Sequence, residues 1–492
     1  QDLSIDEEDS VDDAATLKQD STNASLEEDY SSENVKDSSS NVLQSSKLGK
    51  NINLNGGSFQ NIQDAIDMAN PGDTIYLNGR TYIGLSQITI NKPINIIGAN
   101  RSDQYATLNG MKATRILFIS YAKDVNLTNI KFTNAYNYYD GEWYTGTYEG
   151  GAIFCQAVPN LKIFNCIFTK NFASTKGGAI YITDRRNEAS TALIENCTFI
   201  ENEVGGYRAS YGGAVFLNSD FAHVRNCTFI SNSVIDDTGG AISISGESKV
   251  SNSTFINNTA KMGGAVELYH GSVFSCRFEN NRATSGSAIK IDHRSTIDGC
   301  IFKNNYAKSE GAILVKGSND VISNSQFINN QAGRYGAAIY SWAGADNIKV
   351  DNCQFRGNTA NVSGAIFFVG KNCQISNSLF ENNKASSLLS FGGAICLDNS
   401  GDHTSITNCT FKKNSASIRG GAIYWMGEES KKAIIADSTF ERNSANYGGA
   451  ITIVENLGLI ANSTFEYNSA SYGGAIDNLG NISLIADSTF RY

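Results

Sequence analysis

The chain lacks the features of a membrane-spanning or nucleic-acid-binding protein. None of its apolar runs reaches the roughly 20 residues that a membrane-crossing helix needs. Basic residues are not in excess, because 39 Lys and Arg face 49 Asp and Glu, for a net charge of −10. Residues 1–50 hold 13 acidic residues and 4 lysines, a net of −9, so the remainder is nearly neutral. We therefore expect no membrane span in this chain and no nucleic-acid partner.

Proline and helical periodicity are also scarce. The chain has three prolines in 492 residues, and beyond about residue 150 no apolar stripe with a 3.6-residue spacing runs through it. Glycine pairs, Asn, Ser, Thr and β-branched residues dominate there instead. These residue types are poor helix formers and favour turns and strands. The repeated part of the chain is therefore predicted to be all-β.

What the sequence does contain is a repeat of about 25 residues built from two coupled motifs. Gly-Gly-Ala-Ile, or a close variant, occurs thirteen times between Gly150 and Ile476. In the second motif a Phe follows Cys or Ser by two residues and Ile or Val by five, and the first twelve of these phenylalanines are followed three residues later by Asn. Two motifs at one period indicate a solenoid. The phenylalanines are Phe168, Phe199, Phe229, Phe255, Phe278, Phe302, Phe327, Phe355, Phe380, Phe411, Phe440, Phe465 and Phe490.

The parity of the second motif predicts several short strands in each repeat. Cys166 and Phe168 point to one face of a strand, whereas Ile163 has the wrong parity for that face, so a bend must lie between them. A coil of about 25 residues at about 3.3 Å per residue has a perimeter near 80 Å, which suits a three-sided coil filled by side chains. Coils stacked about 4.8 Å apart through parallel ladders form a parallel β-helix. The preference for right-handed crossovers predicts a right-handed one.

Stacking of such coils explains why residue types recur. Each Phe is expected to lie over the Phe of the next coil, each Ile over Ile, and each Cys or Ser over its like. The recurring Asn is expected to form a ladder whose amides satisfy backbone groups at a corner. The Gly pair is expected to supply a backbone conformation that other residues resist, or to let chains approach closely.

Three parts are predicted along the chain. Residues 1–50 are acidic and Ser-rich and predict a disordered leader. Residues 51–134 predict an N-terminal cap and the first coils, with a short amphipathic helix over 59–69 that covers the open end of the stack. Residues 135–492 predict the β-helix repeats, which break off inside a repeat at Tyr492. We expect a signal peptide to have been removed before Gln1 and a surface anchor to lie beyond Tyr492.

The ten cysteines are predicted to be buried and free. Seven occupy the small position before the Phe, where the other copies carry Ser, so size rather than pairing accounts for them. Parallel side chains in a stack disfavour a disulfide, although one between neighbouring coils is the alternative. No Cys-x-x-Cys spacing suggests zinc, and no metal or cofactor is expected.

The paired motifs resemble the repeat of chlamydial polymorphic outer membrane proteins, which are surface adhesins. The cap motifs at residues 62–66, 70–75 and 92–98 (IQDAI, NPGDTI and KPINIIG) are similar to those of adhesin-like surface proteins of methanogenic archaea. The resemblance covers roughly residues 51–492 and implies a β-helix on the extracellular side of the cell surface. It is less specific for function, because β-helices host lyases, hydrolases, epimerases and adhesins alike.

An enzyme is the main alternative to an adhesin. Polysaccharide lyases and hydrolases of this fold need clustered carboxylates on adjacent coils, whereas the charged residues here are scattered along the sequence. The segments Asp292-His293-Arg294, Asp402-His403 and Asp184-Arg185-Arg186 each occur once and are interpreted as solvated turns. The Gly-rich nonapeptides that bind Ca²⁺ in some β-rolls are missing. We therefore predict that the chain is not an enzyme and has no catalytic residues and no metal site.

An aromatic-rich insertion is the predicted ligand-binding site. Residues 134–148 hold five tyrosines and one tryptophan in a loop that also carries glycine. Exposed rings of this kind stack on sugars or anchor a protein partner, although the loop could equally fold back and bury its rings. A second aromatic set, Tyr211, Tyr335, Phe391, Tyr447 and Tyr472, precedes the Gly pairs and is expected to stack along a corner. The candidate binding residues are Tyr136, Tyr138, Tyr139, Trp143, Tyr144 and Tyr148.

The predicted function is that of a rod-like extracellular adhesin or surface scaffold. Such a rod binds another cell, a host surface or a glycan through its faces and loops. A polysaccharide-degrading lyase or glycoside hydrolase is one alternative, and a purely structural envelope protein is the other. The residues leave open whether the source is bacterial or archaeal, and which ligand is bound.

Overall fold

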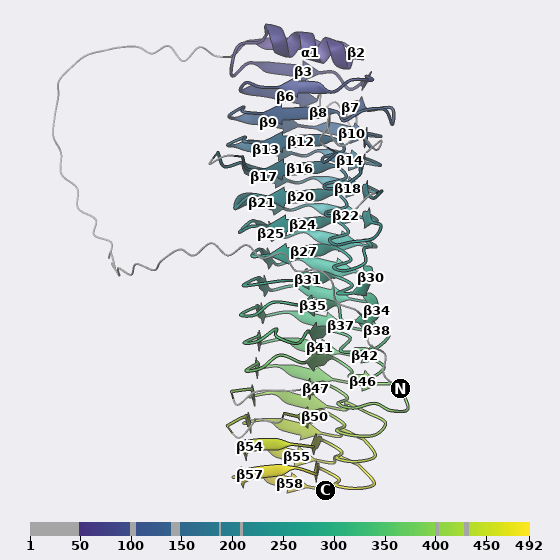
Figure 1. Cartoon of the computed structure of the whole chain (residues 1–492), viewed down its shortest axis with the longest axis vertical. Helices are drawn as coiled ribbons and strands as arrows, with labels where there is room; N and C mark the ends of the chain where they lie inside the picture. The colour runs from purple at the N-terminus through teal and green to yellow at the C-terminus, as the bar shows by residue number, and fades with distance from the viewer. Residues whose placement is uncertain are drawn as a thin grey trace, which may run out of the picture. The chain divides into compact units, whose positions relative to one another are not determined.

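The chain forms a stack of coils whose strands pair in parallel with those of the neighbouring coils (Figure 1). The computed structural model describes residues 49–98, 105–138, 148–185, 188–206, 210–398, 403–427 and 432–492. These residues wind into a right-handed parallel β-helix, as predicted. The predicted leader over 1–50 lies outside the described residues except for its last two positions, 49 and 50.

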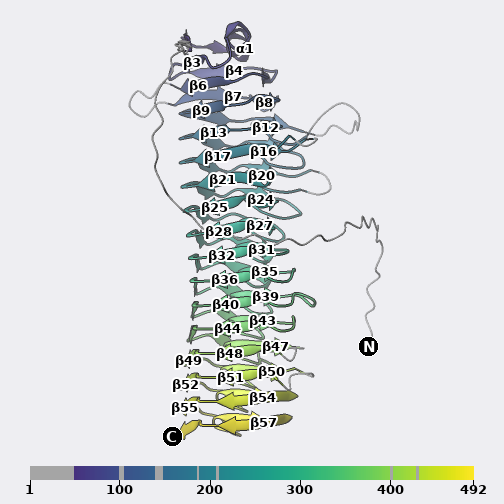
Figure 2. The same cartoon turned by 90° about the vertical axis from the view of Figure 1, so that its left-hand side faces the viewer.

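Sheet A forms one side of each coil and carries the Ile or Val of the second motif. Its neighbours pair in register, so Ile163 lies beside Ile194 and Ile194 beside Val224. Figure 2 shows strands of this sheet beside those of sheet C. Among the described residues, the 17 strands of sheet A are β1 Asn51–Leu54, β3 Thr74–Leu77, β6 Ile94–Gly98, β9 Val125–Thr128, β13 Leu161–Phe164, β17 Thr191–Glu195, β21 Phe221–Arg225, β25 Lys249–Ser251, β28 Ser272–Phe274, β32 Thr296–Asp298, β36 Val321–Ser323, β40 Lys349–Asp351, β44 Gln374–Ser376, β48 Ser405–Thr407, β51 Ile434–Ala436, β54 Asn456–Ala461 and β57 Asn481–Ala486.

Sheet B forms the second side and carries the phenylalanines. It follows sheet A after a bend, as the parity of the motif requires. At this bend Asn165 and Asn196 have φ of 49° and 54°, a left-handed conformation that Asn tolerates better than most residues. In the described part of the chain, the 17 strands of sheet B are β2 Gly57–Ser58, β4 Thr81–Ile83, β7 Ala106–Asn109, β10 Ile130–Thr133, β14 Ile167–Thr169, β18 Thr198–Ile200, β22 Thr228–Ile230, β26 Thr254–Ile256, β29 Arg277–Glu279, β33 Ile301–Lys303, β37 Gln326–Ile328, β41 Gln354–Arg356, β45 Leu379–Glu381, β49 Thr410–Lys412, β52 Thr439–Glu441, β55 Thr464–Glu466 and β58 Thr489–Arg491.

Sheet C forms the third side and begins, in most coils, at the Ile or Val of the Gly-Gly-Ala-Ile motif. Neighbouring strands again pair in register, as Ile180 does with Val215. The 15 strands that the described residues contribute are β5 Ile88–Ile90, β8 Leu117–Ser120, β12 Ile153–Gln156, β16 Ile180–Thr183, β20 Val215–Asn218, β24 Ile242–Ser245, β27 Val266–Tyr269, β31 Ile289–Ile291, β35 Ile313–Val315, β39 Ile339–Ser341, β43 Ile366–Phe368, β47 Ile395–Asp398, β50 Ile423–Met426, β53 Ile451–Ile453 and β56 Ile476–Asn478.

Short strands at the corner between sheets B and C add two further ladders. They hold the segment that follows the recurring Asn and precedes the Gly pair. One ladder contains β11 Tyr136–Asn137, β15 Phe172–Ala173, β19 Glu203–Val204 and β23 Ser233–Val234, and the other contains β30 Arg282–Ser285, β34 Tyr306–Glu310, β38 Gln331–Ala332, β42 Thr359–Ala360 and β46 Lys384–Ala385.

The core is built from ladders of like side chains, as predicted. From Phe132 to Phe490, consecutive phenylalanine rings have centroids 4.6–4.9 Å apart and planes within 3–8° of parallel. Phe132 was expected to be a degenerate first copy, and it stacks on Phe168 at 4.8 Å. All ten cysteines are buried and free, which confirms the prediction for the thiols.

The recurring Asn forms the expected hydrogen-bonded ladder. The side-chain amide of Asn202 donates to the carbonyl of Phe168 at 3.0 Å and to Oδ1 of Asn232 at 2.9 Å. That same Oδ1 accepts the backbone N–H of Asn202 at 3.0 Å. Each fully buried amide therefore has its hydrogen-bonding groups satisfied by the coils on both sides, which removes the desolvation cost of a polar core residue.

The two glycines of the Gly pair have different roles. Gly177 has φ of +61°, a left-handed conformation that disfavours side chains. A Cβ on Gly178 would stand 2.2 Å from the carbonyl oxygen of Gly213 and 2.5 Å from that of Glu203. The first glycine therefore supplies the backbone conformation and the second the close approach, so both expected explanations hold.

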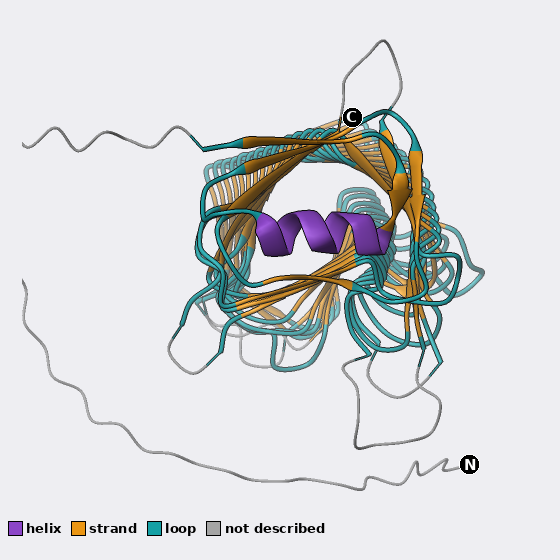
Figure 3. Cartoon of the chain, turned by 90° about the horizontal axis from the view of Figure 1, so that it is seen from above, coloured by secondary structure: helices purple, strands orange, loops and turns teal. Residues whose placement is uncertain are grey.

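The helix α1 (Phe59–Met68) lies across the N-terminal end of the stack (Figure 3). It buries Phe59, Ile62 and Ile66 against the first coil. The ammonium group of Lys92 donates to the carbonyls of Ile66 and Ala69 at the end of the helix, at 3.0 and 3.1 Å. The predicted amphipathic helix is confirmed. None of the helices in the described residues is long and apolar enough to span a membrane.

Candidate functional site

A row of side chains follows sheet C on the face that points away from the core. In β16, Ile180 and Ile182 belong to the main core, whereas Tyr181 points outward and packs with Phe216 of the next coil. The corner segment folds over this row, as Tyr211 does on Phe216 with ring centroids 5.9 Å apart. Among the described residues, the outer row consists of Thr89, Phe118, Phe154, Tyr181, Phe216, Ser243, Glu267, Lys290, Leu314, Tyr340, Phe367, Cys396, Tyr424, Thr452 and Asp477.

Near its middle the outer row changes from aromatic to charged residues. Lys290 Nζ lies 2.8 Å from Glu267 Oε1 and 2.8 Å from Asp292 Oδ2, and the Ser243 hydroxyl donates to the second oxygen of Glu267. Glu267 and Lys290 are only 6 % and 8 % exposed. We call Ser243, Glu267, Lys290 and Asp292 the charged cluster.

Charges in the cluster compensate one another. Burial by itself lowers the pKa of Lys290, but the carboxylates of Glu267 and Asp292 outweigh it and raise the pKa above its ordinary value, so the ammonium stays protonated. Burial, and then the charge of Glu267, raise the pKa of the nearby Asp237 carboxyl. Two carboxylates held by one lysine on adjacent coils are groups that can orient a polar ligand or exchange protons with it.

The sequence prediction missed this cluster, although it singled out the segment Asp292-His293-Arg294 as a solvated turn. Glu267 and Lys290 occupy the position directly after Gly-Gly-Ala-Val and Gly-Ser-Ala-Ile, where other repeats carry mostly aromatic or small residues. A charged residue at this position in two consecutive repeats was the available signal. The rings of His293 and Tyr269 lie beside the cluster, with centroids 5.9 Å apart.

The other segments with acid and base neighbours do not form such clusters. Asp184 Oδ1 accepts the backbone N–H of Ser190 at 2.6 Å, and the Arg185 guanidinium lies 5.9 Å from the ring of Tyr121. Arg186 and Asp402 lie outside the described residues. The exposed His403 lies in a groove on another side of the molecule.

The predicted aromatic insertion is described only at its two ends. Tyr136 stacks on Phe172 of the next coil at 4.8 Å, and the exposed Tyr138 lies 5.8 Å from Tyr136. Tyr148 is half-buried at the other end of the insertion. Tyr139, Trp143 and Tyr144 lie outside the described residues. The described part of the insertion thus offers one exposed ring, Tyr138, and two half-buried rings, Tyr136 and Tyr148.

The aromatic residues before the Gly pairs form separate groups rather than one stack. Tyr447 and Tyr472 stack directly, at 5.0 Å. Tyr211 and Tyr335 instead pack on residues of the outer row, with Tyr335 lying 4.6 Å from Phe367. Cations lie over several of these rings, as Arg419 does over Tyr447 at 4.8 Å. The corner and the outer row therefore form several separate aromatic and cationic groups along sheet C.

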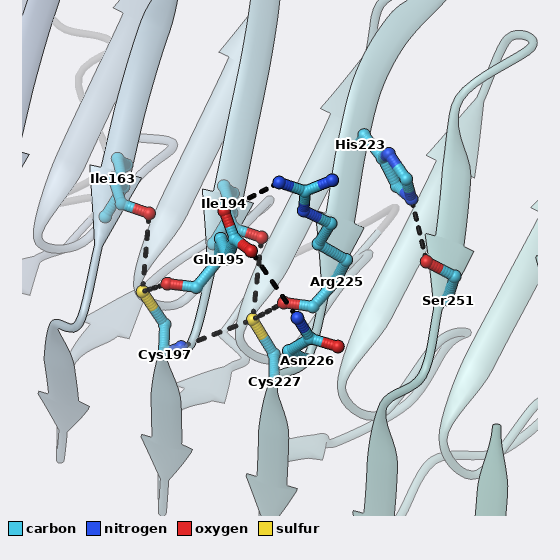
Figure 4. Close-up of polar contacts among 9 residues, drawn as sticks. All are labelled: Ile163, Ile194, Glu195, Cys197, His223, Arg225, Asn226, Cys227 and Ser251. Carbon is cyan, nitrogen blue, oxygen red and sulfur yellow. Dashed lines mark hydrogen bonds and ion pairs between the residues drawn. The ribbon is translucent and has the colours of Figure 1, made fainter.

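Polar side chains also line the outside of sheet A (Figure 4). The buried thiols of Cys197 and Cys227 lie nearby, at the bend between sheets A and B. Arg225 donates to Glu195 at 2.9 Å, and His223 Nε2 lies 2.8 Å from the hydroxyl of Ser251. Burial and the charge of Arg225 lower the pKa of His223. The Cys227 thiol donates to backbone carbonyls, and burial raises its pKa well above the ordinary value. Because the thiolate is the reactive form, burial of this kind disfavours reaction of Cys227 as a nucleophile.

Comparisons with known proteins agree with this architecture. The family described as the right handed beta helix region matches residues 32–260 and 240–411, and the Chlamydia polymorphic membrane protein repeat matches residues 408–424. A probable autotransporter of Escherichia coli is 34 % identical over 194 residues, covering 35 % of this chain and 14 % of that protein. A metabotropic glutamate receptor-like protein of Dictyostelium discoideum is 24 % identical over 359 residues, covering 66 % of this chain and 24 % of that protein. The chain therefore spans less than a quarter of the length of each relative.

The solved structures with a similar backbone include enzymes that act on polysaccharides. An alginate lyase of polysaccharide lyase family 6, solved with a trisaccharide, is 11 % identical with a TM-score of 0.43, covering 88 % of this chain and 87 % of the lyase. Further family 6 or alginate lyases are also similar. At this level of identity the likeness concerns the fold alone.

The prediction that the chain is not an enzyme is contradicted by these neighbours and is withdrawn. It relied on the scatter of charged residues along the sequence. The register of the coils brings distant charged residues together. Glu267 and Asp292 are 25 residues apart in sequence, yet both contact Lys290. The charged cluster thus supplies the neighbouring carboxylates that seemed to be missing.

Proposed function

Because the chain belongs to the right-handed β-helix family, we propose that it is an extracellular, surface-exposed rod that binds cells, host surfaces or glycans, as an adhesin does. The observation that carries the proposal is its 34 % identity to a probable autotransporter over 194 residues. The match to a chlamydial membrane-protein repeat at residues 408–424 supports the same location. Whether the cap also relates the chain to adhesin-like proteins of methanogenic archaea stays a prediction.

The difference between inward and outward positions of each coil supports a binding role. Inward positions are occupied by the same residue types coil after coil, while the outer row of sheet C varies between aromatic, charged and small residues. Exposed rings along this side include Tyr138 and Trp342, at 53 % and 43 % exposure. Exposed rings on a rigid scaffold bind with little loss of conformational entropy.

Binding of the purified chain to cells and to glycan arrays tests the proposal. Replacement of Tyr138 and Trp143 by Ala is expected to weaken binding about tenfold, because aromatic side chains that become buried in an interface contribute much of its binding energy. Phe221→Ala, an exposed ring on sheet A, is the matched control and should leave binding unchanged. Absence of binding to any cell or glycan overturns the proposal, and binding that survives the double replacement removes the insertion from the site.

The charged cluster favours a second candidate, a polysaccharide-cleaving enzyme. Carboxylates and an ammonium group on adjacent coils are the groups that acid–base cleavage of a glycosidic linkage requires. Incubation with a panel of polysaccharides should then release oligosaccharides, and Glu267→Gln should abolish the release while leaving the circular dichroism spectrum unchanged. If no product forms with any polysaccharide, this candidate is rejected.

A further inference from the structure

The bend between sheets A and B carries the same short sequence in five coils. In each of them, an Asn at the bend is followed by Cys or Ser and then by the Thr that begins a strand of sheet B. Asn-x-Thr, where x is not Pro, is the acceptor sequence for N-linked glycans in secreted proteins. The five segments are Asn196-Cys197-Thr198, Asn226-Cys227-Thr228, Asn252-Ser253-Thr254, Asn408-Cys409-Thr410 and Asn462-Ser463-Thr464.

The fold by itself favours each residue type in these segments. The five asparagines have φ between 44° and 54°, a left-handed conformation that Asn adopts more readily than most residues. The middle residue is buried inside the coil, and the half-buried Thr points outward from a strand, where a β-branched residue is favoured. Access to the asparagine side chains therefore decides whether these segments can be modified.

All five asparagines are exposed at the outer surface of the bend. The side-chain amide of Asn226 donates to Glu195 at 3.4 Å (Figure 4), and that of Asn408 donates to Asn377 at 2.7 Å. An amide has two hydrogens and a glycan replaces one of them, so each of these hydrogen bonds can persist after modification. The fully buried Asn202 of the core ladder, by contrast, uses both amide hydrogens within the protein.

The register of the coils places the acceptors in a line along one edge of the stack. Asn196, Asn226 and Asn252 follow paired residues of sheet A in three consecutive coils, so they lie about 4.8 Å apart. This spacing is comparable to the width of a single sugar ring, so glycans on directly neighbouring coils compete for space. Asn408 and Asn462 are separated by one coil, whose bend carries no Asn, so both can be modified at once.

We propose that the bend between sheets A and B is a site of N-linked glycosylation, with the five exposed asparagines as acceptors. The inference rests on the proposed function, because this modification belongs to secreted proteins. In the transfer, Nδ2 of the Asn bonds to C1 of a sugar carried on a diphosphate donor, and the amide loses one proton. The bond from C1 to the phosphate oxygen breaks, and the diphosphate leaves with the electron pair. Sheet C forms the remaining side of each coil, so glycans at this bend leave its outer row free to contact a partner.

Mass spectrometry of the chain isolated from the cells that produce it tests the inference. Peptides that contain Asn408 or Asn462 should carry the additional mass of a glycan. Asn226 should be modified only on molecules in which Asn196 and Asn252 are not, because the three lie on neighbouring coils. Absence of sugars from all five asparagines would overturn the inference.

Two replacements separate modification from the structural role of the bend. Thr198→Val keeps the branched shape of the side chain but removes the hydroxyl, so the mass increase at Asn196 should be lost. Gln354→Thr completes the acceptor sequence at Asn352, which is exposed and has φ of 51°, so a new mass increase should appear there.

Thr439→Val is the matched control for the first replacement. Thr439 begins β52 and occupies the same position after the bend, but the bend residue of its coil is Asp437, so the replacement should change no modification. A mass increase at Asn196 that persists in Thr198→Val would overturn the inference, as would the absence of a new one in Gln354→Thr.

Failure of the inference is distinguishable from failure of the proposed function. If protease treatment of whole cells releases the chain without sugars, the bend is not an acceptor and the adhesin proposal stands. If the chain carries sugars at the bend but binds no cell and no glycan, the adhesin proposal fails and the inference stands.

Discussion

At the scale of single residues, most core side chains have a like neighbour above and below, and Asp320 does not. It occupies an inward position near the start of β36, between Ser295 and Ile348 of the adjacent coils, and is 0 % exposed. One carboxylate oxygen accepts the backbone N–H of Ser295 at 2.8 Å, and the other has no hydrogen-bond partner among the described residues. A buried carboxylate with one unsatisfied oxygen favours its protonated form.

Asp320 therefore predicts a loss of stability toward neutral pH. Burial raises its pKa from 3.8 to about 7 in the folded chain. Because the folded state holds the proton more tightly than the unfolded state, stability falls as pH rises from about 4 to 7, by at most about 4 kcal/mol, and this contribution is then constant. Thermal melting at pH 5 and pH 8 should show the difference, and Asp320→Asn should reduce it. Asp124→Asn, at an exposed corner, is the control; a difference unchanged by Asp320→Asn would contradict the assignment.

At the scale of secondary-structure elements, the corner before sheet C sets the tightest limits. The second glycine of most pairs packs its Cα against backbone atoms of the next coil, whereas the glycine at residue 344 has positive φ but open space around it. Both positions disfavour a side chain, for different reasons. At the second glycine of the pair the requirement is steric, whereas at Gly344 it is the backbone conformation alone.

Gly213→Ala is expected to destabilise the coils around β20 strongly. Its Cβ would lie 2.1 Å from the carbonyl oxygen of Gly240 and 2.6 Å from that of Ser233, so the backbones must separate, at a cost above about 3 kcal/mol. Gly344→Ala meets no atom within 4 Å at φ of +83° and should cost about 1 kcal/mol. Chemical denaturation of the two variants measures the difference. Equal losses would show that close approach at Gly213 is not limiting.

The helix α1 makes a second prediction at this scale. It covers the end of the stack with Ile62, which is fully buried. Ile62→Asp places a charge there, so the helix should detach and leave the edges of β1 and β2 open to pairing between chains. Light scattering should detect association that rises with concentration. Gln60→Asp adds the same charge on the exposed face of the helix and should leave the chain monodisperse if the cap acts as described.

At the scale of the whole molecule, each coil packs mainly against its two neighbours, and contacts that skip a coil, such as that of Arg419 with Asp477, are few among the described residues, so damage should stay local. Phe255 contacts the rings of Phe229 and Phe278, at 4.8 Å each. Phe255→Ala should cost roughly 3–5 kcal/mol in these coils and accelerate amide exchange in β22, β26 and β29 but not in β49. Hydrogen-exchange mass spectrometry makes the measurement, with the exposed Phe164→Ala as the control. Loss of protection along the entire stack would show global cooperativity instead.

Much of the fold was predictable from the sequence, because residues at the same position of successive repeats must lie side by side in a stack of coils. The spacing of Phe168, Phe199 and Phe229 identified the stacked ladder, and the wrong parity of Ile163 identified the bend. The charged cluster was harder to predict, because its signal was limited to a charged residue directly after the glycine motif in two consecutive repeats. Glu267 and Lys290 are charged residues at positions that both motifs leave unspecified, and their contact follows from coil register rather than from any local pattern.

Register also governs how such a chain changes over generations. From Phe168 onward the coils present the same Phe, Asn and Ile or Val ladders on their upper and lower sides. A duplicated coil would therefore pack against neighbours that already fit it. Unequal recombination within the coding sequence can therefore add or delete units with little effect on folding, while the outer positions of the new copy diverge. The number of coils can therefore change under selection independently of the outer residues that determine which ligand binds.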